Sequence, residues 1–583
     1  MQRLSRLFSS ALIAVSVVAL QACGGGGGGT APTNLNPGNT TPPVATPPGT
    51  NTPVTNPPTI SPPVTTPPPA VGQVQITGDA SYESVTNKAG SAALDYANIT
   101  TKPMRGILIA AVSGTTIVSS ATTSDTGAYA LNVPANSNVS IAVAALMTKT
   151  TGPANWNVGI YDNTDQGALW QIGFAAASAG STNSVRNIKV PLGWNAATLK
   201  YDEAQRASGP FAILDTIYNG MQLVTSVAPA TQFPALTVFW SPKNTTVNGS
   251  RTTGEIGTSF FTELPGATAA APPQRTLFIL GKEGTDTDEF DSGVIAHEYG
   301  HYLQSAFSQS HSTGGAHSTG NYLDMTLSYG EGWGYAFASL VRNSPDNPDS
   351  SGPRQDTGGV IRTGTDPATN PNASVGWFSE SSVQYIIYKL GVDKGFAPIW
   401  ASFSGPMKSG QDALNTIFTF AAGVRSAAAG AAASLNTLLD GQKIYAGANA
   451  DQWGTGETNN GGNVNNLPVH QVLTIGAEPV PLCFNKQYSN NPNPNKLGER
   501  RYLRFNNPAT GSRTITVSST AANGHDIDFL IYQRGGQIGL AEETNTTSEI
   551  FTGNLQAGEV LIRAYDYNLS SASTTNCATI RVN

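Results

Sequence analysis

Apolar and polar residues follow two different periods along this chain, and the change of period divides it into regions. Between residues 73 and 150 the apolar residues come in short runs bounded by Gly, Pro and Asn, which predict strands. We expect these strands at 106–112, 128–133 and 139–143. Short apolar runs return near the C-terminus, and we expect strands there at 502–505, 513–517, 529–532 and 559–564. The pattern thus predicts an all-β domain near each end of the chain.

The middle of the chain, residues 201–475, mixes the two periods. Longer stretches with helical spacing predict helices at 211–224, 294–307 and 327–338, and shorter runs predict strands at 236–240 and 275–280. Residues 381–446 are expected to be mostly helical, with an Ala-rich stretch that fits core packing. We therefore predict an α+β core at 201–475, joined to the first β domain (73–150) by a connecting segment at 151–200.

The first 72 residues differ in composition from the rest. A basic start precedes the apolar run 11–20, which is too short to span a bilayer, so residues 1–22 are expected to be a signal peptide. The run ends in Leu-Gln-Ala-Cys, which resembles a bacterial lipobox. That resemblance implies lipid on Cys23 and attachment to the outer membrane or cell surface; cleavage without lipidation, and secretion, is the alternative. Residues 23–72, rich in Gly, Pro and Thr, predict a flexible tether.

Composition narrows the partners and the compartment. Only 12% of the 583 residues are charged, the net charge is −7, and there is no basic run, which argues against a nucleic-acid partner. The length predicts three or four domains. With Cys23 set aside, Cys483 and Cys577 remain, and in an oxidising compartment we expect them to form a disulfide within the last domain, 476–583. Two buried free thiols are the alternative.

The candidate chemistry lies at His297-Glu298-Tyr299-Gly300-His301. Positions i and i+4 of a helix share one face, so the two imidazoles can reach one metal ion, with Glu298 beside them as a base. This is the H-E-x-x-H pattern of zinc peptidases. A catalytic zinc needs a third protein ligand, and Glu331 fits because a carboxylate in an apolar helical stretch is costly unless it is paired or binds a metal. The rival ligands are Asp324, His311 and His317.

An acidic run, residues 286–291, precedes the helix that carries the motif. Asp288 or Asp291 suits the N-cap of that helix, and negative charge there is favoured by the helix dipole. The alternative is a bound cation such as Ca²⁺. Residues 162–167 are also rich in oxygen ligands, but they lack the full spacing of a calcium loop and favour a plain turn.

H-E-x-x-H followed by a glutamate on a later helix resembles the gluzincins, the thermolysin-like metallopeptidases, over roughly residues 200–450. The resemblance implies a thermolysin-like core with one zinc ion on His297, His301 and Glu331, with Glu298 as general base and a polypeptide as substrate. It also implies a strand that pairs with the substrate backbone, for which 275–280 is the candidate. One position departs from the family, because Tyr335 stands where many members have an aspartate that holds a histidine ligand.

The resemblance further implies a donor that stabilises the oxyanion of the transition state. His317 and Tyr385 are the two candidates we favour. The other candidates are Tyr322, Tyr329 and His470, and for all five residues packing or a polar surface position is the alternative explanation.

The flanking domains resemble two known modules. The stretch 103–134 resembles a carboxypeptidase regulatory-like β-sandwich, and Asp526-Ile527-Asp528 with Leu555–Gly558 resembles the bacterial pre-peptidase C-terminal domain. The expected function is therefore a surface-tethered zinc endopeptidase. Two alternatives stay open: a catalytically silent binding lipoprotein on the same fold, and an aminopeptidase of the same clan, although the Gly-x-Met-Glu-Asn stretch of those aminopeptidases is absent.

Overall fold

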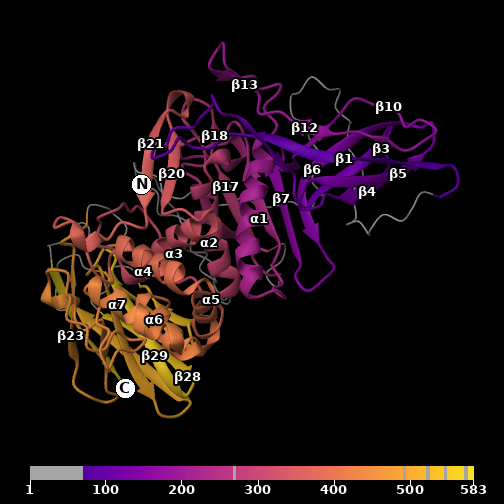
Figure 1. Ribbon diagram of the computed structural model, residues 1–583. Coiled ribbons are helices and arrows are strands. Elements are labelled where there is room, and N and C mark those ends of the chain that lie inside the picture. The colour runs from indigo at the N-terminus through magenta and orange to yellow at the C-terminus, as the bar shows by residue number, and fades with distance from the viewer. Residues whose placement is uncertain (1–69, 267–270, 490–493, 520–525, 544–547, 570–574) are drawn as a thin grey trace, which may run out of the picture.

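The computed structural model describes residues 70–266, 271–489, 494–519, 526–543, 548–569 and 575–583. The predicted signal peptide, Cys23 and the tether lie outside these residues, except for the last few residues of the tether. The chain is a β-rich multidomain protein in which several sheets surround one group of helices (Figure 1). Within the described part, no helix combines the length and apolar character needed to cross a bilayer.

The N-terminal strands form two sheets. In the first, the long strand β1 (Gln73–Ser84) is central and pairs with β2 (Thr100–Pro103), β5 (Ala128–Pro134), β11 (Ser184–Val185) and β12 (Ile188–Val190). The second sheet contains β3 (Ile107–Ser113), β4 (Thr116–Thr122), β6 (Asn138–Lys149) and β7 (Trp156–Asp162). The strands predicted at 106–112, 128–133 and 139–143 are confirmed, and the last continues to Lys149.

The second sheet does not end with the predicted first domain. Its strand order is β16-β17-β15-β7-β6-β3-β4, so β7 pairs in parallel with β15 (Leu236–Trp240) of the predicted core. The segment predicted as a connection, 151–200, supplies β7 and the short strands β8 (Ala168–Leu169), β9 (Gln171–Gly173), β10 (Ala177–Ser178), β11, β12 and β13 (Trp194–Asn195). The boundaries predicted at residues 150 and 200 therefore do not divide the sheet.

The strand predicted to pair with substrate is also placed differently. β17 (Gln274–Ile279), which covers the predicted strand 275–280, lies inside the sheet between β15 and β16 (Phe260–Leu264). Both of its edges are already paired, so it has no backbone groups free for a peptide. The edge strand is β16, because apolar periodicity identifies a strand but not its position in the sheet.

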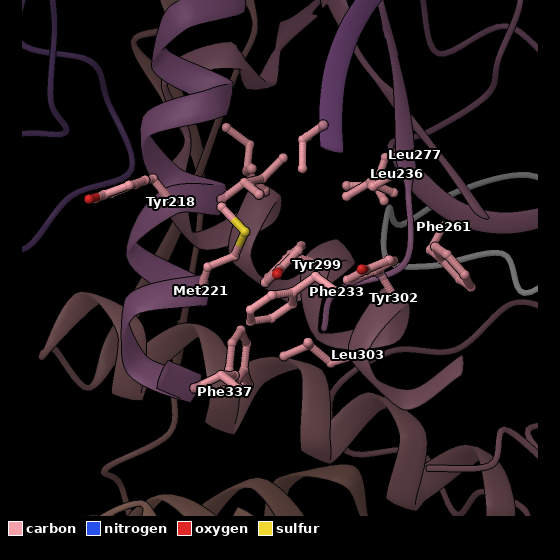
Figure 2. Packing of buried hydrophobic residues seen from close by; sticks show 14 of the residues in the cluster. Tyr218, Met221, Phe233, Leu236, Phe261, Leu277, Tyr299, Tyr302, Leu303 and Phe337 are labelled. Carbon is pink, nitrogen blue, oxygen red and sulfur yellow. The ribbon is translucent and has the colours of Figure 1, made fainter. Parts of the chain in front are cut away.

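The helices form the centre of the molecule. They are α1 (Gly209–Val227), α2 (Ser292–Phe307), α3 (Met325–Arg342), α4 (Glu380–Lys394), α5 (Ala397–Ser404), α6 (Ile417–Ala427) and α7 (Ala432–Gly441). Figure 2 shows how α1 packs on α2 and α3: Met221 of α1 faces Tyr299 of α2 and Phe337 of α3. These side chains are almost fully buried, so α2, which carries the H-E-x-x-H motif, is fixed on its apolar side.

Helices α2 and α3 approach each other closely because glycines line their contact. A Cβ on Gly300 would lie 3.3 Å from the Cα of Gly334. The indole N–H of Trp333 donates to the carbonyl of Gly300 at 2.8 Å. Asp324 caps α3 by accepting from the N–H of Thr326 at 2.9 Å. The small residues thus bring the motif helix and the Glu331 helix within reach of one ion.

A four-stranded sheet borders the start of α2. It consists of β18 (Gly281–Lys282), β19 (Asp286–Thr287), β20 (Asp346–Ser351) and β21 (Thr357–Arg362), paired in that order. Asp286 of β19 is opposite Ser351 of β20. A single 3-10 turn, Asp288–Phe290, connects β19 to α2.

The C-terminal region is a two-sheet β-sandwich. One sheet has the order β22 (His470–Val472), β24 (Arg500–Asn507), β29 (Gly558–Asp566), β26 (Ile527–Gln533), β27 (Gly536–Ala541). The other has the order β23 (Val480–Asn485), β30 (Thr575–Val582), β25 (Gly511–Ser519), β28 (Ser548–Leu555). The predicted disulfide is confirmed, since Cys483 of β23 is bonded to its opposite residue Cys577 of β30. The disulfide thus joins two neighbouring strands of one sheet of the sandwich.

Candidate metal centre

Three predicted ligands converge between α2 and α3. His297 Nε2 lies 3.0 Å from His301 Nε2 and 3.2 Å from Glu331 Oε2, and the latter oxygen lies 3.6 Å from His301 Nε2. All three side chains are buried. They form one of the groups in the described chain whose ligand atoms all lie within 4.8 Å of one another.

The spacing of these atoms fits a zinc ion. Two ligands about 2.0–2.1 Å from a tetrahedral zinc lie about 3.3–3.4 Å apart, and the three observed separations of 3.0, 3.2 and 3.6 Å fall on either side of that value. Two imidazoles and a carboxylate are also a donor set that a catalytic zinc accepts. The residues present therefore fit the metal that the sequence predicts.

The electrostatics favour the metal-binding charge states of His297 and Glu331; at His301 burial lowers the pKa, but the Glu331 carboxylate outweighs this and raises the pKa above its usual value. Burial lowers the pKa of His297, which keeps its ring neutral. Burial alone would raise the pKa of Glu331, but the nearby His317 and His301 hold it well below its usual range, so its carboxylate stays ionised. Neutral imidazole and ionised carboxylate are the forms that bind metal.

The outer nitrogens of the two ligands lack the usual partner. Nδ1 of His297 and Nδ1 of His301 are buried and have no hydrogen-bond partner in the described part of the chain. Tyr335, the residue that departs from the resemblance noted in the sequence, packs its ring 4.3 Å from the ring of His297, centroid to centroid. Ring packing, and not a hydrogen bond to an acid, therefore positions this ligand.

Glu298 lies beside the ligands and at the edge of the ten-stranded sheet. Its Oε2 accepts the backbone N–H of Phe261 in β16 at 2.8 Å. Burial, with a smaller contribution from Glu331, raises its pKa to about 8. A dication in the adjacent site would favour the ionised form, the one that accepts a proton.

His317 is the predicted catalytic residue that the structure brings to the site. Its Nε2 lies 3.5 Å from Glu331 Oε2, and its Nδ1 lies 2.9 Å from Glu380 Oε2. Glu380 is the first residue of α4, where Ser379 caps the helix through the N–H of Ser382. Sequence reasoning missed Glu380, because an acid in a first helical turn is explained by the helix dipole alone.

The loop that carries His317 is held by the C-terminal region. The side-chain amide of Asn495 donates to the carbonyls of Gly314 and Ala316 at 3.0 and 3.1 Å, and Lys496 Nζ donates to the carbonyl of Ala316 at 2.7 Å. Arg563 of β29 donates to the carbonyl of His311 at 3.0 Å. His317 thus depends on residues far away in the chain for its position.

The other sequence candidates lie elsewhere. Tyr385 is on α4, but five residues after Glu380, so it points about 140° away around the helix, and it is not among the residues that line the cleft. Tyr329 donates to the sulfur of Met407, and the Nδ1 of His470 pairs with the carbonyl of Trp453. Tyr322 stacks on Phe378 and Tyr488. The rivals for the third ligand are likewise occupied, since Asp324 caps α3 and His311 bonds Gly535.

A cleft opens beside the metal ligands. About 760 Å³ of space not filled by atoms lies in and in front of it, open solvent included. The helical side supplies His297, Glu298, His317 and Tyr335, and the opposite side is formed by β20 and β21, with residues Asn347, Pro348, Asp349, Gly359 and Ile361.

The acidic run before α2 is only in part a helix cap. Asp291 occupies the N-cap position of α2, but its side chain caps nothing; it accepts from Asn87 at 2.7 Å and from the backbone N–H of Ser350 at 2.9 Å. Asp286, Asp288 and Asp349 form a separate group of carboxylates. At 162–167 the predicted turn is confirmed, because Asp162 accepts the N–H and hydroxyl of Thr164.

Comparison with known proteins gives little. The chain matches no family model and no curated protein sequence. Among solved structures, the pre-peptidase C-terminal domain of a Bacillus anthracis collagenase is similar over 20% of this chain and 94% of its own, with 8% identity and a TM-score of 0.16. The Aeromonas hydrophila periplasmic inhibitor of g-type lysozyme is similar over 20% of this chain and 99% of its own, with 14% identity and a TM-score of 0.13. Neither likeness carries an argument about function.

Proposed function

We propose that this protein is a zinc-dependent endopeptidase with a thermolysin-like catalytic core. The observation that carries the proposal is the convergence of His297, His301 and Glu331 at zinc-ligand spacing, with the Glu298 carboxylate beside them on an open cleft. A zinc ion bound there supplies a Lewis acid that polarises the scissile carbonyl and lowers the pKa of a bound water.

Glu298 is the general base. Its carboxylate is next to the ligand His297 on α2, and one of its oxygens is fixed by the N–H of Phe261. The ionised carboxylate takes a proton from the attacking water and passes it to the leaving amine. The contact to Phe261 also attaches the base to the edge strand β16. The base therefore has a fixed position relative to a substrate that pairs with this strand.

The remaining polar groups bind and orient the substrate. β16 is the sheet edge that pairs with an extended peptide, because β17 is enclosed on both sides. His317, held by Glu380 at 2.9 Å, donates to the developing oxyanion. Tyr385 is withdrawn from this role because its place on α4 turns it away from the cleft.

The proposed location is the bacterial outer membrane or cell surface. The lipobox-like sequence supports a lipid on Cys23, and the Gly-, Pro- and Thr-rich segment after it is proposed to act as the tether. The C-terminal sandwich is proposed to be a pre-peptidase C-terminal-like domain. The disulfide between Cys483 and Cys577 agrees with an exported protein.

The test is cleavage of unfolded casein by the zinc-loaded chain, with Glu298→Gln as the matched control. The substitution keeps the side-chain volume and all three ligands, so zinc content measured by atomic absorption should stay at one per chain while cleavage is lost. Cleavage by Glu298→Gln at the wild-type rate would refute the mechanism. Stoichiometric zinc without cleavage in the wild type would favour the silent binding protein, and cleavage only of peptides with a free amino terminus would favour an aminopeptidase.

A further inference from the structure

A second group of side chains that can bind a metal lies where β19 meets the turn that leads into α2. Asp286, Asp288 and Asp349 each direct one carboxylate oxygen to a common point, and these oxygens lie within 4.8 Å of one another. We propose that this group binds a calcium ion that fastens the start of the zinc helix to strand β20.

The strand pairing explains why these residues meet. Asp286 of β19 is opposite Ser351 of β20, and Asp349 is two residues before Ser351, so both aspartates are on the same face of the sheet. Asp349 is in turn opposite Gly359 of β21, which has no side chain to cover it. Asp288 follows Asp286 by two residues and begins the turn before α2.

An unpartnered buried oxygen points to a missing ligand. Asp288 is 3% exposed, and only its Oδ2 has a protein partner, the hydroxyl of Ser259. Its Oδ1 has no hydrogen-bond partner in the described part of the chain, and neither has Oδ1 of Asp286. A buried carboxylate oxygen without a partner costs several kcal/mol if it is charged, unless a cation neutralises it.

Protein cations do not fill this role. Among the described residues, no Lys, Arg or His nitrogen lies within 4.0 Å of the carboxylates of Asp286, Asp288 or Asp349. Burial, together with repulsion from Asp349 and Asp291, raises the pKa of Asp286 to about 8, and burial raises that of Asp349 to about 6. The neighbouring Asp291 differs, because Asn87 and Ser350 saturate its carboxylate.

The chemistry of the group selects calcium. All three donors are carboxylate oxygens, which hard cations such as calcium prefer. Zinc is better served by the imidazoles of the His-containing site. The group is at the edge of the cleft, where Asp349 is also a lining residue, so water can complete a coordination of six to eight oxygens. The donors come from β19, the 3-10 turn after it and the distant strand β20, and calcium tolerates such an irregular ligand set better than magnesium, which demands near-ideal octahedral geometry.

The ion would act on the architecture of the metal centre and not on its chemistry. It would join the turn before α2 to β20, the strand that forms the far wall of the cleft. Both sides of the cleft would then be fixed at one point, while His297 and His301 would still be held by the packing of α2 on α3. We therefore expect calcium to raise thermal stability even when zinc is already bound.

The experiment uses the full chain with Glu298→Gln, which prevents self-cleavage, loaded with zinc and freed of calcium on a chelating resin. Calcium is titrated in by isothermal calorimetry, and thermal unfolding is recorded with and without it. Asp288→Asn and Asp349→Asn are the test variants. Asp346→Asn is the matched control, because Asp346 is on the same strand and half-buried but is paired with Arg362.

We expect the parent protein and Asp346→Asn to bind calcium and to unfold at a higher temperature in its presence. Asp288→Asn and Asp349→Asn should weaken this binding at least about tenfold and lose the calcium-dependent rise in unfolding temperature. A parent protein without binding heat or stabilisation would overturn the proposal. So would calcium binding that both test variants retain, since the ion would then lie elsewhere, for example near Asp526 and Asp528.

Discussion

Gly334 of α3 is the position where one added methyl group should separate metal binding from folding. A Cβ at this glycine would lie 2.7 Å from Cε1 and Nδ1 of His297 and 3.0 Å from its Nε2. Carbon atoms in ordinary contact are about 3.5–4.0 Å apart, so Gly334→Ala must push the imidazole back by roughly 0.8 Å or more. Metal–ligand distances tolerate only about ±0.2 Å.

We expect the Gly334→Ala chain to fold but to lose zinc binding and, with it, cleavage. A misplacement near 1 Å costs about 10²-fold in rate, so we expect cleavage of casein to fall at least that far and zinc affinity to fall with it. Folding should change little, because alanine gains up to about 1 kcal/mol of helix propensity over glycine while overpacking costs about 1–3 kcal/mol. The unfolding temperature of the zinc-free protein should therefore move by a few degrees at most.

Gly330→Ala is the control on the same helix. A Cβ there would meet nothing closer than the Cβ of Ser312 at 3.6 Å, an ordinary contact. This variant should keep its zinc and its activity. The assay is zinc content after dialysis against a competing chelator, together with the rate of casein cleavage. The reasoning would be refuted if Gly334→Ala retained stoichiometric zinc and wild-type cleavage.

Three further predictions test other parts of the structure. Glu380→Gln should lower kcat about ten- to hundredfold with zinc content and KM nearly unchanged, because only the orientation of His317 is lost; an equal change in KM would contradict this role. Replacing Cys483 and Cys577 with serine should lower the free energy of unfolding of the C-terminal sandwich, measured in urea, by up to about 4–5 kcal/mol; an unchanged midpoint would contradict it. Without calcium, thermal stability should fall as the pH rises from about 4 to about 8, because unfolded aspartates ionise near 3.9 whereas burial and repulsion from Asp349 and Asp291 raise the pKa of the folded Asp286 to about 8; a melting temperature that rises over this range would contradict this.

The convergence of the candidate metal ligands could be predicted because much of their geometry is local. His297, Glu298 and His301 need only a helix, and the apolar stretch around them predicts one. Glu331 required a second helix at the right angle, which the sequence suggested only through a carboxylate in an apolar stretch. In each case the prediction depends only on residues that lie within a dozen positions of one another.

The rest depends on pairings between distant segments. Apolar periodicity does not determine strand order. The pattern therefore assigns 275–280 to the substrate edge and divides one continuous sheet between two domains, and both predictions are wrong. Asp349 joins Asp286 only because β20 pairs with β19, and Glu380 looks like an ordinary first-turn acid until α4 is placed against His317. The N–H of Phe261 carries no side-chain signal at all.

The continuous sheet has a consequence for proteolytic maturation. Many secreted peptidases discard an N-terminal segment, but removing 73–200 here would take β7 away from β15. The freed edge would be Leu-Thr-Val-Phe-Trp at 236–240, a five-residue apolar strand with unpaired backbone groups, which is a template for aggregation. We therefore expect the N-terminal strands to remain part of the processed protein, with any cut falling before residue 73.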